Sequence, residues 1–233
     1  MPAQESHPEI ELLNEMQRFL RAAVHDLRAA QRRTGTAAEL LLQAGDQERE
    51  AVAAQLLQGL SKTEELLTGI GRYATALTPA SYAIHLFPSI SAVRFALAHL
   101  ENEIRETSAT IDVGDLPDIA GDRNRLAELF EHLIGNALKF RGPDPPAVEI
   151  GARRTAEGWR FSVKDNGIGI APKYRDRLFI PFRRLHGAEV PGAGLGLAIS
   201  QKIVAAHRGR IWIEDGSPSG VTFFFILPAA DGD

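Results

Sequence analysis

The sequence of 233 residues contains no cysteine. This absence excludes disulfide bonds, thiolate catalysis and cysteine zinc sites, so the fold has to be stabilised by packing, and it suits the reducing cytoplasm in which we expect the protein. The sequence also lacks a run of about 20 apolar residues that could span a bilayer. Its first stretch, MPAQESHPEIELLNEM, has no basic start followed by an apolar run, as a secretory signal would have. We therefore expect a soluble chain without a membrane span.

The sequence also has no excess of positive charge. It contains 26 Lys and Arg and 30 Asp and Glu, which gives a net charge of -4. Such a chain offers no broad cationic field, so nucleic acid and anionic lipid are not expected as partners. With 44% hydrophobic and 24% charged residues, the composition is that of an ordinary globular protein. The length allows one large domain or two small ones.

Glycine and proline are nearly absent from residues 8–42, which are rich in strong helix formers. This stretch predicts one long helix. A second helix is predicted from a possible N-cap at Asp46 to about Leu77. In both helices, apolar and small residues alternate steps of three and four, the spacing of a coiled-coil seam. The seam positions are Leu13, Met16, Leu20, Ala23, Leu27, Ala30, Thr34, Ala37 and Leu41, then Val52, Leu56, Gly59, Thr63, Leu66, Ile70, Tyr73 and Leu77.

The two helices are predicted to pair as an antiparallel hairpin, which makes residues 1–78 a dimerisation domain. One hairpin with Ala, Gly and Thr in its seams buries little apolar surface, so we expect two copies to form a four-helix bundle. The alternative is that the hairpin packs on its own C-terminal domain. His25 lies two residues from Ala23 and Leu27, about 200° around the helix from each. The imidazole is therefore expected to face solvent.

The pattern changes near residue 79, where Pro79 and Pro88 interrupt it and short β-type segments begin to alternate with helices. Residues 79–233 are therefore predicted to form a second domain. We expect helices at 89–107, 122–140 and 195–207, and strands at 109–113, 147–155, 159–165, 210–215 and 220–227. The close spacing of the second and third strands predicts a hairpin, and hence a partly antiparallel sheet in an α/β sandwich.

Two segments of this domain place polar side chains where a ligand could bind. HLIGNALKF ends a predicted helix and puts Asn136 and Lys139 on one helical face. VKDNGIGI leaves a predicted strand at the Asp165 carboxylate, where Gly167 and Gly169 permit backbone geometry closed to other residues. Taken separately, the amide could cap a helix or be buried, and the glycines could form a plain turn.

A third segment, PGAGLGLAI, places Gly192, Gly194 and Gly196 just before a predicted helix, whose exposed N–H groups favour phosphate. Its glycines do not have the G-x-G-x-x-G spacing of a dinucleotide fingerprint, and the chain has no Walker A sequence. A flexible loop would explain this segment alone. The order and context of all three segments are more specific.

These residues resemble the two-component sensor histidine kinases, and among them the soluble kinase modules of phytochromes. VHDLR is similar to the phospho-acceptor box, HLIGNALKFR to the N box, DNGIGI and GAGLGLAI to the two glycine boxes, and LFIPFRRLH to the box that contains phenylalanine. The resemblance extends from about Leu12 to Pro228. It implies a dimeric helical hairpin, followed by an α/β sandwich of the histidine kinase and gyrase type that binds ATP and Mg²⁺.

The resemblance also implies roles for individual residues. His25 would attack the γ-phosphoryl group of ATP, with Asp26 orienting the ring and taking its proton, and the phosphoryl group would then pass to an aspartate of a separate response-regulator receiver domain. Asn136 would bind Mg²⁺, Lys139 would contact phosphate, and Asp165 would accept a hydrogen bond from the adenine amino group. Further nucleotide contacts are implied for Phe140, Gly167, Gly169, Ile170, Gly192, Gly194, Leu195 and Gly196, with residues 183–191 as a lid.

The sequence departs from the family pattern at three places. Ala30 replaces a proline after the histidine, so we expect no kink in the first helix. Ala29 stands where many of these enzymes have a Thr or Asn, which predicts weak phosphatase activity towards the partner. His132 replaces an Asn in the N box. Two other functions therefore stay open: a non-catalytic dimeric phosphotransfer scaffold with a degenerate ATP site, and an ATP-driven conformational clamp.

Overall fold

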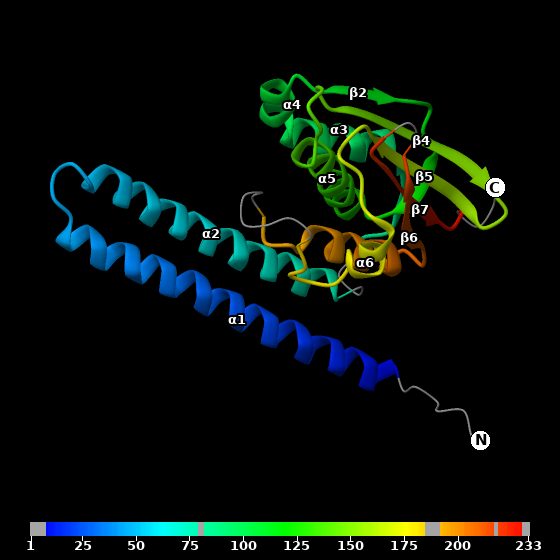
Figure 1. The fold of residues 1–233 in the computed structure, drawn as a ribbon. Helices are drawn as coiled ribbons and strands as arrows, with labels where there is room; N and C mark the ends of the chain where they lie inside the picture. The colour runs from blue at the N-terminus through cyan, green and yellow to red at the C-terminus, as the bar shows by residue number, and fades with distance from the viewer. Residues whose placement is uncertain (1–7, 79–81, 185–191, 217–218, 230–233) are drawn as a thin grey trace.

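The computed structural model describes residues 8–78, 82–184, 192–216 and 219–229. The predicted hairpin is present: α1 (Pro8–Gln43) is unbroken, as expected from Ala30, and runs antiparallel to α2 (Arg49–Ala76) (Figure 1). The predicted N-cap at Asp46 is wrong. The chain turns at Gly45, whose carbonyl accepts the N–H groups of Glu48 and Arg49, so the helix begins later, after Glu48.

The predicted seam is correct along α2 and along the second half of α1, where Ala30 is only 1% exposed. It is wrong at the start of α1, because Met16 is 42% and Leu20 is 54% exposed. Phe19 takes their place, since its ring stacks on Tyr73 of α2 with centroids 4.3 Å apart. Leu13, Met16 and Leu20 thus lie open along the outer side of α1.

The sheet has five strands in the order β2-β4-β5-β7-β6, with β2 parallel to β4 and the other pairs antiparallel. These strands are β2 (Thr110–Val113), β4 (Ala147–Thr155), β5 (Gly158–Asp165), β6 (Arg210–Asp215) and β7 (Val221–Leu227). Each agrees with its predicted range to within one residue. Two short paired strands, β1 (His85–Pro88) and β3 (Asp118–Gly121), were not predicted, because four residues are too few to establish an alternating pattern.

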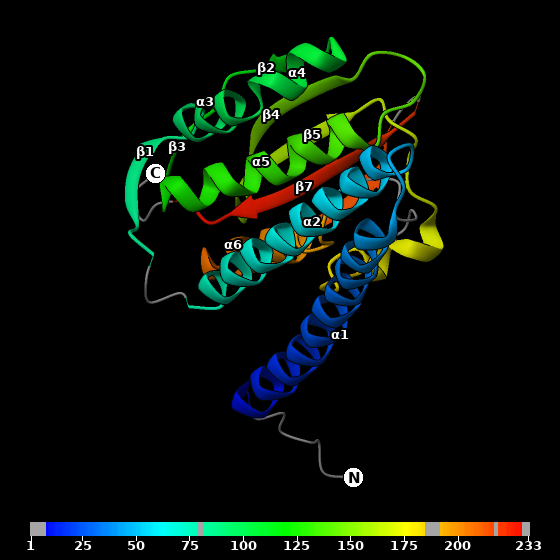
Figure 2. The same ribbon diagram turned by 90° about the vertical axis from the view of Figure 1, so that its left-hand side faces the viewer.

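Helices cover one face of this sheet (Figure 2). They are α3 (Ile90–His99), α4 (Glu101–Thr107), α5 (Arg123–Lys139) and α6 (Gly196–Ala206). The helix predicted at 89–107 is therefore two helices, separated at Leu100. Between the layers, Phe130 of α5 meets Phe161 and Phe225 of the sheet edge-on, with centroids 6.2 and 5.6 Å away. This aromatic core fixes α5 over the middle strands.

His207 ties the end of α6 to the start of α5. Its Nδ1 lies 2.7 Å from the carbonyl oxygen of Ile203, and its Nε2 accepts the N–H of Asp122 at 2.9 Å. The carbonyl only accepts, so Nδ1 carries the proton of a neutral ring. Burial lowers the pKa of His207, and the contacts with Ile203 and Asp122 only partly oppose this effect.

The hairpin packs on the sandwich of its own chain, as the alternative from the sequence allowed, with α2 lying along α6 (Figures 1 and 2). The helices approach closely at Gly69, where an added Cβ would lie 2.8 Å from Cδ1 of Leu195. In the described ranges, no helix combines the length and the hydropathy that crossing a membrane requires.

Candidate functional site

A cavity of about 630 Å³ lies between α5, the glycine-rich loops and α2, within the size range of small-molecule sites. Almost every residue that the sequence singled out for a ligand lines it. These residues are Asn136, Lys139, Phe140, Asp165, Gly169, Ile170, Gly192, Gly194, Leu195 and Gly196. Gly167 is not part of the lining but donates its N–H to the lining residue Asp165, whereas His25 and Asp26 lie outside the lining, on α1.

Asp165 ends β5 and is fixed by backbone groups. It is 8% exposed, and its Oδ1 accepts the N–H of Gly167 at 2.8 Å and that of Val221 at 3.3 Å. Burial raises the pKa of this carboxyl, partly offset by these two hydrogen bonds. Since both bonds use Oδ1, Oδ2 is placed to accept a hydrogen bond from a ligand.

Two glycines allow the backbone to pass close to Asp165. Gly167 has an ordinary φ. Glycine is needed there because an added Cβ would lie only 2.5 Å from the carbonyl oxygen of Phe140. Gly220, which the sequence did not single out, has φ +78°, and its added Cβ would lie 2.0 Å from the backbone oxygen of Asp165. A side chain at Gly220 would therefore displace the carboxylate.

The end of α5 is joined to the first glycine loop, because the N–H of Ile168 donates to the carbonyl of Phe140 at 3.0 Å. This bond holds the loop beside the helical face that carries Asn136 and Lys139. An amide oxygen, an ammonium group and the Asp165 carboxylate thus converge on one cavity.

The second glycine loop leads into α6. Gly192 has φ +135° and Gly194 has φ +71°, so both adopt backbone geometry that other residues rarely reach. The carbonyl of Gly194 accepts the N–H of Phe182 at 2.9 Å, which ties the phenylalanine-containing segment to this loop. Leu195 is the N-cap of α6, so the free N–H groups of its first turn open on the cavity, where they favour anions. Of the expected lid, residues 183 and 184 line the cavity, and residues 185–191 lie outside the described part.

His132 lines the same cavity, one helical turn before Asn136. Its Nδ1 is buried and has no hydrogen-bond partner among the described residues. Burial lowers the pKa of the imidazole from 6.5 to about 4; the charge of Glu131 raises it, and those of Arg72 and Lys139 lower it. The ring is therefore neutral at physiological pH.

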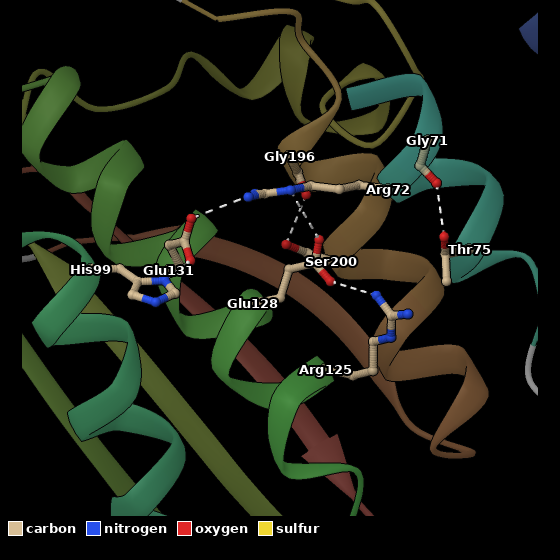
Figure 3. Close-up of polar contacts among 9 residues, drawn as sticks. All are labelled: Gly71, Arg72, Thr75, His99, Arg125, Glu128, Glu131, Gly196 and Ser200. Atoms are coloured by element: carbon tan, nitrogen blue, oxygen red, sulfur yellow. Dashed lines mark hydrogen bonds and ion pairs between the residues drawn. The ribbon is translucent and has the colours of Figure 1, made fainter. Parts of the chain in front are cut away.

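Helix α2 forms one wall of the cavity, which sequence reasoning did not foresee. Arg72 reaches from α2 to α5, with its guanidinium 3.5 Å from Glu131 and 3.9 Å from Glu128 (Figure 3). His99 and Arg125 hold these two glutamates from the other side, each at 3.0 Å. Ser61, Glu64, Glu65, Thr68 and Gly69 of α2 complete this wall.

A second set of contacts joins α1 to the sandwich. Tyr73 is fully buried, and its hydroxyl donates to Glu15 at 2.8 Å. Glu15 also accepts from Lys202 of α6 at 2.7 Å. Burial raises the pKa of Glu15, but the hydrogen bonds from Lys202 and Tyr73 outweigh it and hold the pKa below its ordinary value. Phe19 continues this contact to Phe182, with ring centroids 5.3 Å apart.

His25 faces solvent as predicted, with a side chain that is 77% exposed. Its Nδ1 lies 2.9 Å from Oδ1 of Asp26, so side-chain reach joins neighbours that do not share a helical face. The ring borders a shallow hollow on α1 between Val24 and Arg28. An exposed imidazole beside a carboxylate is therefore present, apart from the cavity.

The comparisons with known proteins agree with this arrangement. Residues 121–231 match the family described as histidine kinase-, DNA gyrase B-, and HSP90-like ATPase. Cyanobacterial phytochrome A of Nostoc sp. is 38% identical over 219 residues, which cover 92% of this chain and 28% of the relative. The chain spans less than a third of the length of the curated relatives that it matches first.

Two solved structures share the arrangement of both parts. Histidine kinase ThkA, in complex with the response regulator protein TrrA, matches with a TM-score of 0.67 and 21% identity, over 96% of this chain and 64% of that one. Full-length ShkA, in complex with AMPPNP, matches with a TM-score of 0.60 and 26% identity, over 92% of this chain and 46% of that one.

Proposed function

We propose that this chain, which is the catalytic core of a sensor histidine kinase in sequence and fold, uses Mg²⁺-ATP to phosphorylate itself on His25. It would then phosphorylate an aspartate of a separate response regulator. The predicted fold class, a helical hairpin before a histidine kinase and gyrase-type sandwich, is confirmed by these similarities. We assign residues 1–78 to dimerisation and phospho-acceptance, and residues 79–233 to ATP binding. The observation that carries the proposal is one chain with both the lined cavity and the exposed His25–Asp26 pair.

The cavity suits a purine nucleotide. Asp165, fixed through Oδ1, would accept the adenine amino group at Oδ2, and Phe140 and Ile170 would contact the ring. Lys139 offers a point charge to the phosphates, and the glycine loop with the first turn of α6 offers backbone N–H groups. The ShkA structure is a complex with AMPPNP, an ATP analogue, and this complex supports the choice of ligand.

Asn136 fits the role of a Mg²⁺ ligand. Mg²⁺ in ATP sites usually binds through one or two protein oxygens together with the substrate phosphates. Within the described ranges, no group of three or more His, Asp or Glu side chains is placed to hold a metal without such help. The cation would neutralise phosphate charge, while Asn136 and Lys139 orient the chain of phosphates.

His25 has the hydrogen bonding that a nucleophile needs. Because a carboxylate only accepts, the ring proton of the His25–Asp26 pair belongs on Nδ1, and Nε2 keeps a lone pair. Nε2 would attack the γ-phosphorus, the bond from that phosphorus to the β–γ bridging oxygen would break, and ADP would leave with the electron pair. Asp26 would take the Nδ1 proton, leaving neutral phosphohistidine.

The phosphoryl group would then pass from the histidine to a carboxylate oxygen of an aspartate in the receiver domain. The response regulator in the ThkA complex supports this class of partner. The open side of α1, with Leu13, Met16 and Leu20, supports homodimerisation through the hairpin. Since the His25 hollow and the cavity share no residue, transfer needs the ATP-binding domain to move, or to serve the other subunit.

The test is incubation with γ-labelled ATP and Mg²⁺, comparing the wild type, His25→Gln and His85→Gln. His85 is an exposed histidine on β1 and serves as the matched control. We expect label that is labile in acid and stable in alkali in the wild type and in the control. We expect none in His25→Gln.

The outcomes separate the alternatives. Absence of label, in a protein that still binds ATP by calorimetry, would contradict an autokinase and favour a scaffold. ATP hydrolysis without labelled protein would favour a conformational clamp. Loss of label on adding a receiver-domain protein, with label appearing on its aspartate, is the expected second step.

A further inference from the structure

Two side chains of α5 point into the nucleotide cavity from the same helical face. His132 and Asn136 are four residues apart, and such neighbours have Cβ atoms about 5–6 Å apart. The same spacing brings two histidines of a helix onto one zinc ion in the HExxH motif. One cation can therefore contact both residues.

The His132 ring lies at the start of α6, where the nucleotide phosphates are expected. An added Cβ on Gly196, the first residue of α6, would lie 3.3 Å from Cδ2 of His132. The buried Nδ1 has no partner in the described protein, and an unsatisfied buried polar atom costs free energy. A ligand entering the cavity can relieve this cost.

The chemistry of the ring decides which ligand suits it. Burial and the neighbouring cations keep the pKa of His132 far below 7, so the ring brings no charge to phosphate. A neutral imidazole has a lone pair that first-row transition-metal ions bind better than the harder Mg²⁺ does, and Mn²⁺ is the one among them that also accepts the oxygen ligands of a Mg²⁺ site. Mg²⁺ prefers oxygen ligands.

We propose that His132 is a second protein ligand, beside Asn136, for the divalent cation that accompanies ATP, and that its nitrogen shifts the preference of the site from Mg²⁺ towards Mn²⁺. The proposal rests on the proposed function, since the cation enters with the nucleotide. It makes His132 a specificity residue of the same site.

The test uses Mn²⁺ with AMPPNP and measures electron spin-echo envelope modulation, which detects nitrogen bound directly to Mn²⁺. Wild-type protein is prepared with natural histidine and with ¹⁵N-histidine, so the signal is assigned without any substitution. His132→Asn is the variant, and His85→Asn is the matched control. Calorimetry gives the affinity for AMPPNP with Mn²⁺ and with Mg²⁺.

We expect histidine-nitrogen modulation in the wild type and in His85→Asn, changed by ¹⁵N-histidine and lost in His132→Asn. We also expect the ratio of Mn²⁺ to Mg²⁺ affinity to fall about tenfold in His132→Asn, the lower end for disturbing a metal's ligand environment. Binding of Mn²⁺-AMPPNP to the wild type without histidine modulation would overturn this inference and leave the ATP site standing. Failure to bind AMPPNP with either cation would overturn both.

Discussion

Substitution of Gly220 by alanine tests how the nucleotide site is built. Gly220 has φ +78°, and its added Cβ would lie 2.0 Å from the backbone oxygen and 2.7 Å from Oδ1 of Asp165. A left-handed conformation costs a residue other than glycine about 1–2 kcal/mol. Overpacking against atoms that cannot rotate away costs about 1–3 kcal/mol. We therefore expect Gly220→Ala to lower the free energy of unfolding by about 2–5 kcal/mol.

Thermal unfolding, followed by circular dichroism, measures this cost. At about 2–4 °C for each kcal/mol in a chain of this size, the Tm should fall by about 4–20 °C. Nucleotide binding should also weaken at temperatures where the variant is folded, because the added methyl group displaces the Asp165 carboxylate. Losing one hydrogen bond to a charged group costs about 1.5–3 kcal/mol, or roughly tenfold or more in the Kd for ADP by calorimetry.

Gly142→Ala is the matched control, because Gly142 follows α5 with φ outside the left-handed range and no atom within 4 Å of an added Cβ. It should keep the wild-type Tm and Kd. If Gly220→Ala unfolded and bound ADP like this control, the close approach of Gly220 to Asp165 would have no energetic role and the reasoning would be refuted.

Three further predictions concern the remaining contacts. His207, whose pKa burial holds below 6.5, stays neutral while the unfolded chain takes up a proton, so stability should decline as the pH falls below about 6.5; urea unfolding from pH 7 to 5 should show a shallower decline in His207→Gln. Tyr73→Phe removes the hydroxyl that donates to Glu15, and should lower the free energy of unfolding by about 1–3 kcal/mol while ADP affinity is kept. Leu20→Glu should turn dimers into monomers by light scattering, whereas Leu42→Glu, at the exposed end of α1, should not.

Features that local backbone chemistry controls were predictable from the sequence. The strands of the main sheet were found within one residue, and Gly169, with φ +74°, has the backbone geometry closed to other residues that the sequence predicted for it. Gly167 was predicted to have the same geometry, and Gly196 to stand at the start of a phosphate-binding helix, but the φ angles of both are ordinary. Their role is close approach, to Phe140 and to His132 respectively, which depends on segments that are distant in the sequence.

The sequence patterns could not predict that α2 lines the nucleotide cavity. A seam of alternating three and four steps shows that a helix face is covered, but not which element covers it. Tyr73 is a predicted seam position, but it meets Phe19, which was not one of the predicted seam residues. From the sequence, the neighbouring Arg72 looks like an ordinary surface arginine. In the structure, the docking of α2 places Arg72 beside Glu128 and Glu131 of α5 (Figure 3).

His132 shows where sequence and structure each contribute. Its spacing from Asn136 already places the two residues on one helical face, and its identity marks it as a departure from the family pattern. Neither fact distinguishes a damaged site from an altered one. The fold adds that the ring lies at Gly196 in the cavity lining and that Nδ1 is buried without a partner among the described residues. This geometry is the reason why we propose an altered cation site, because a divalent cation bound with the nucleotide would supply the partner that Nδ1 lacks.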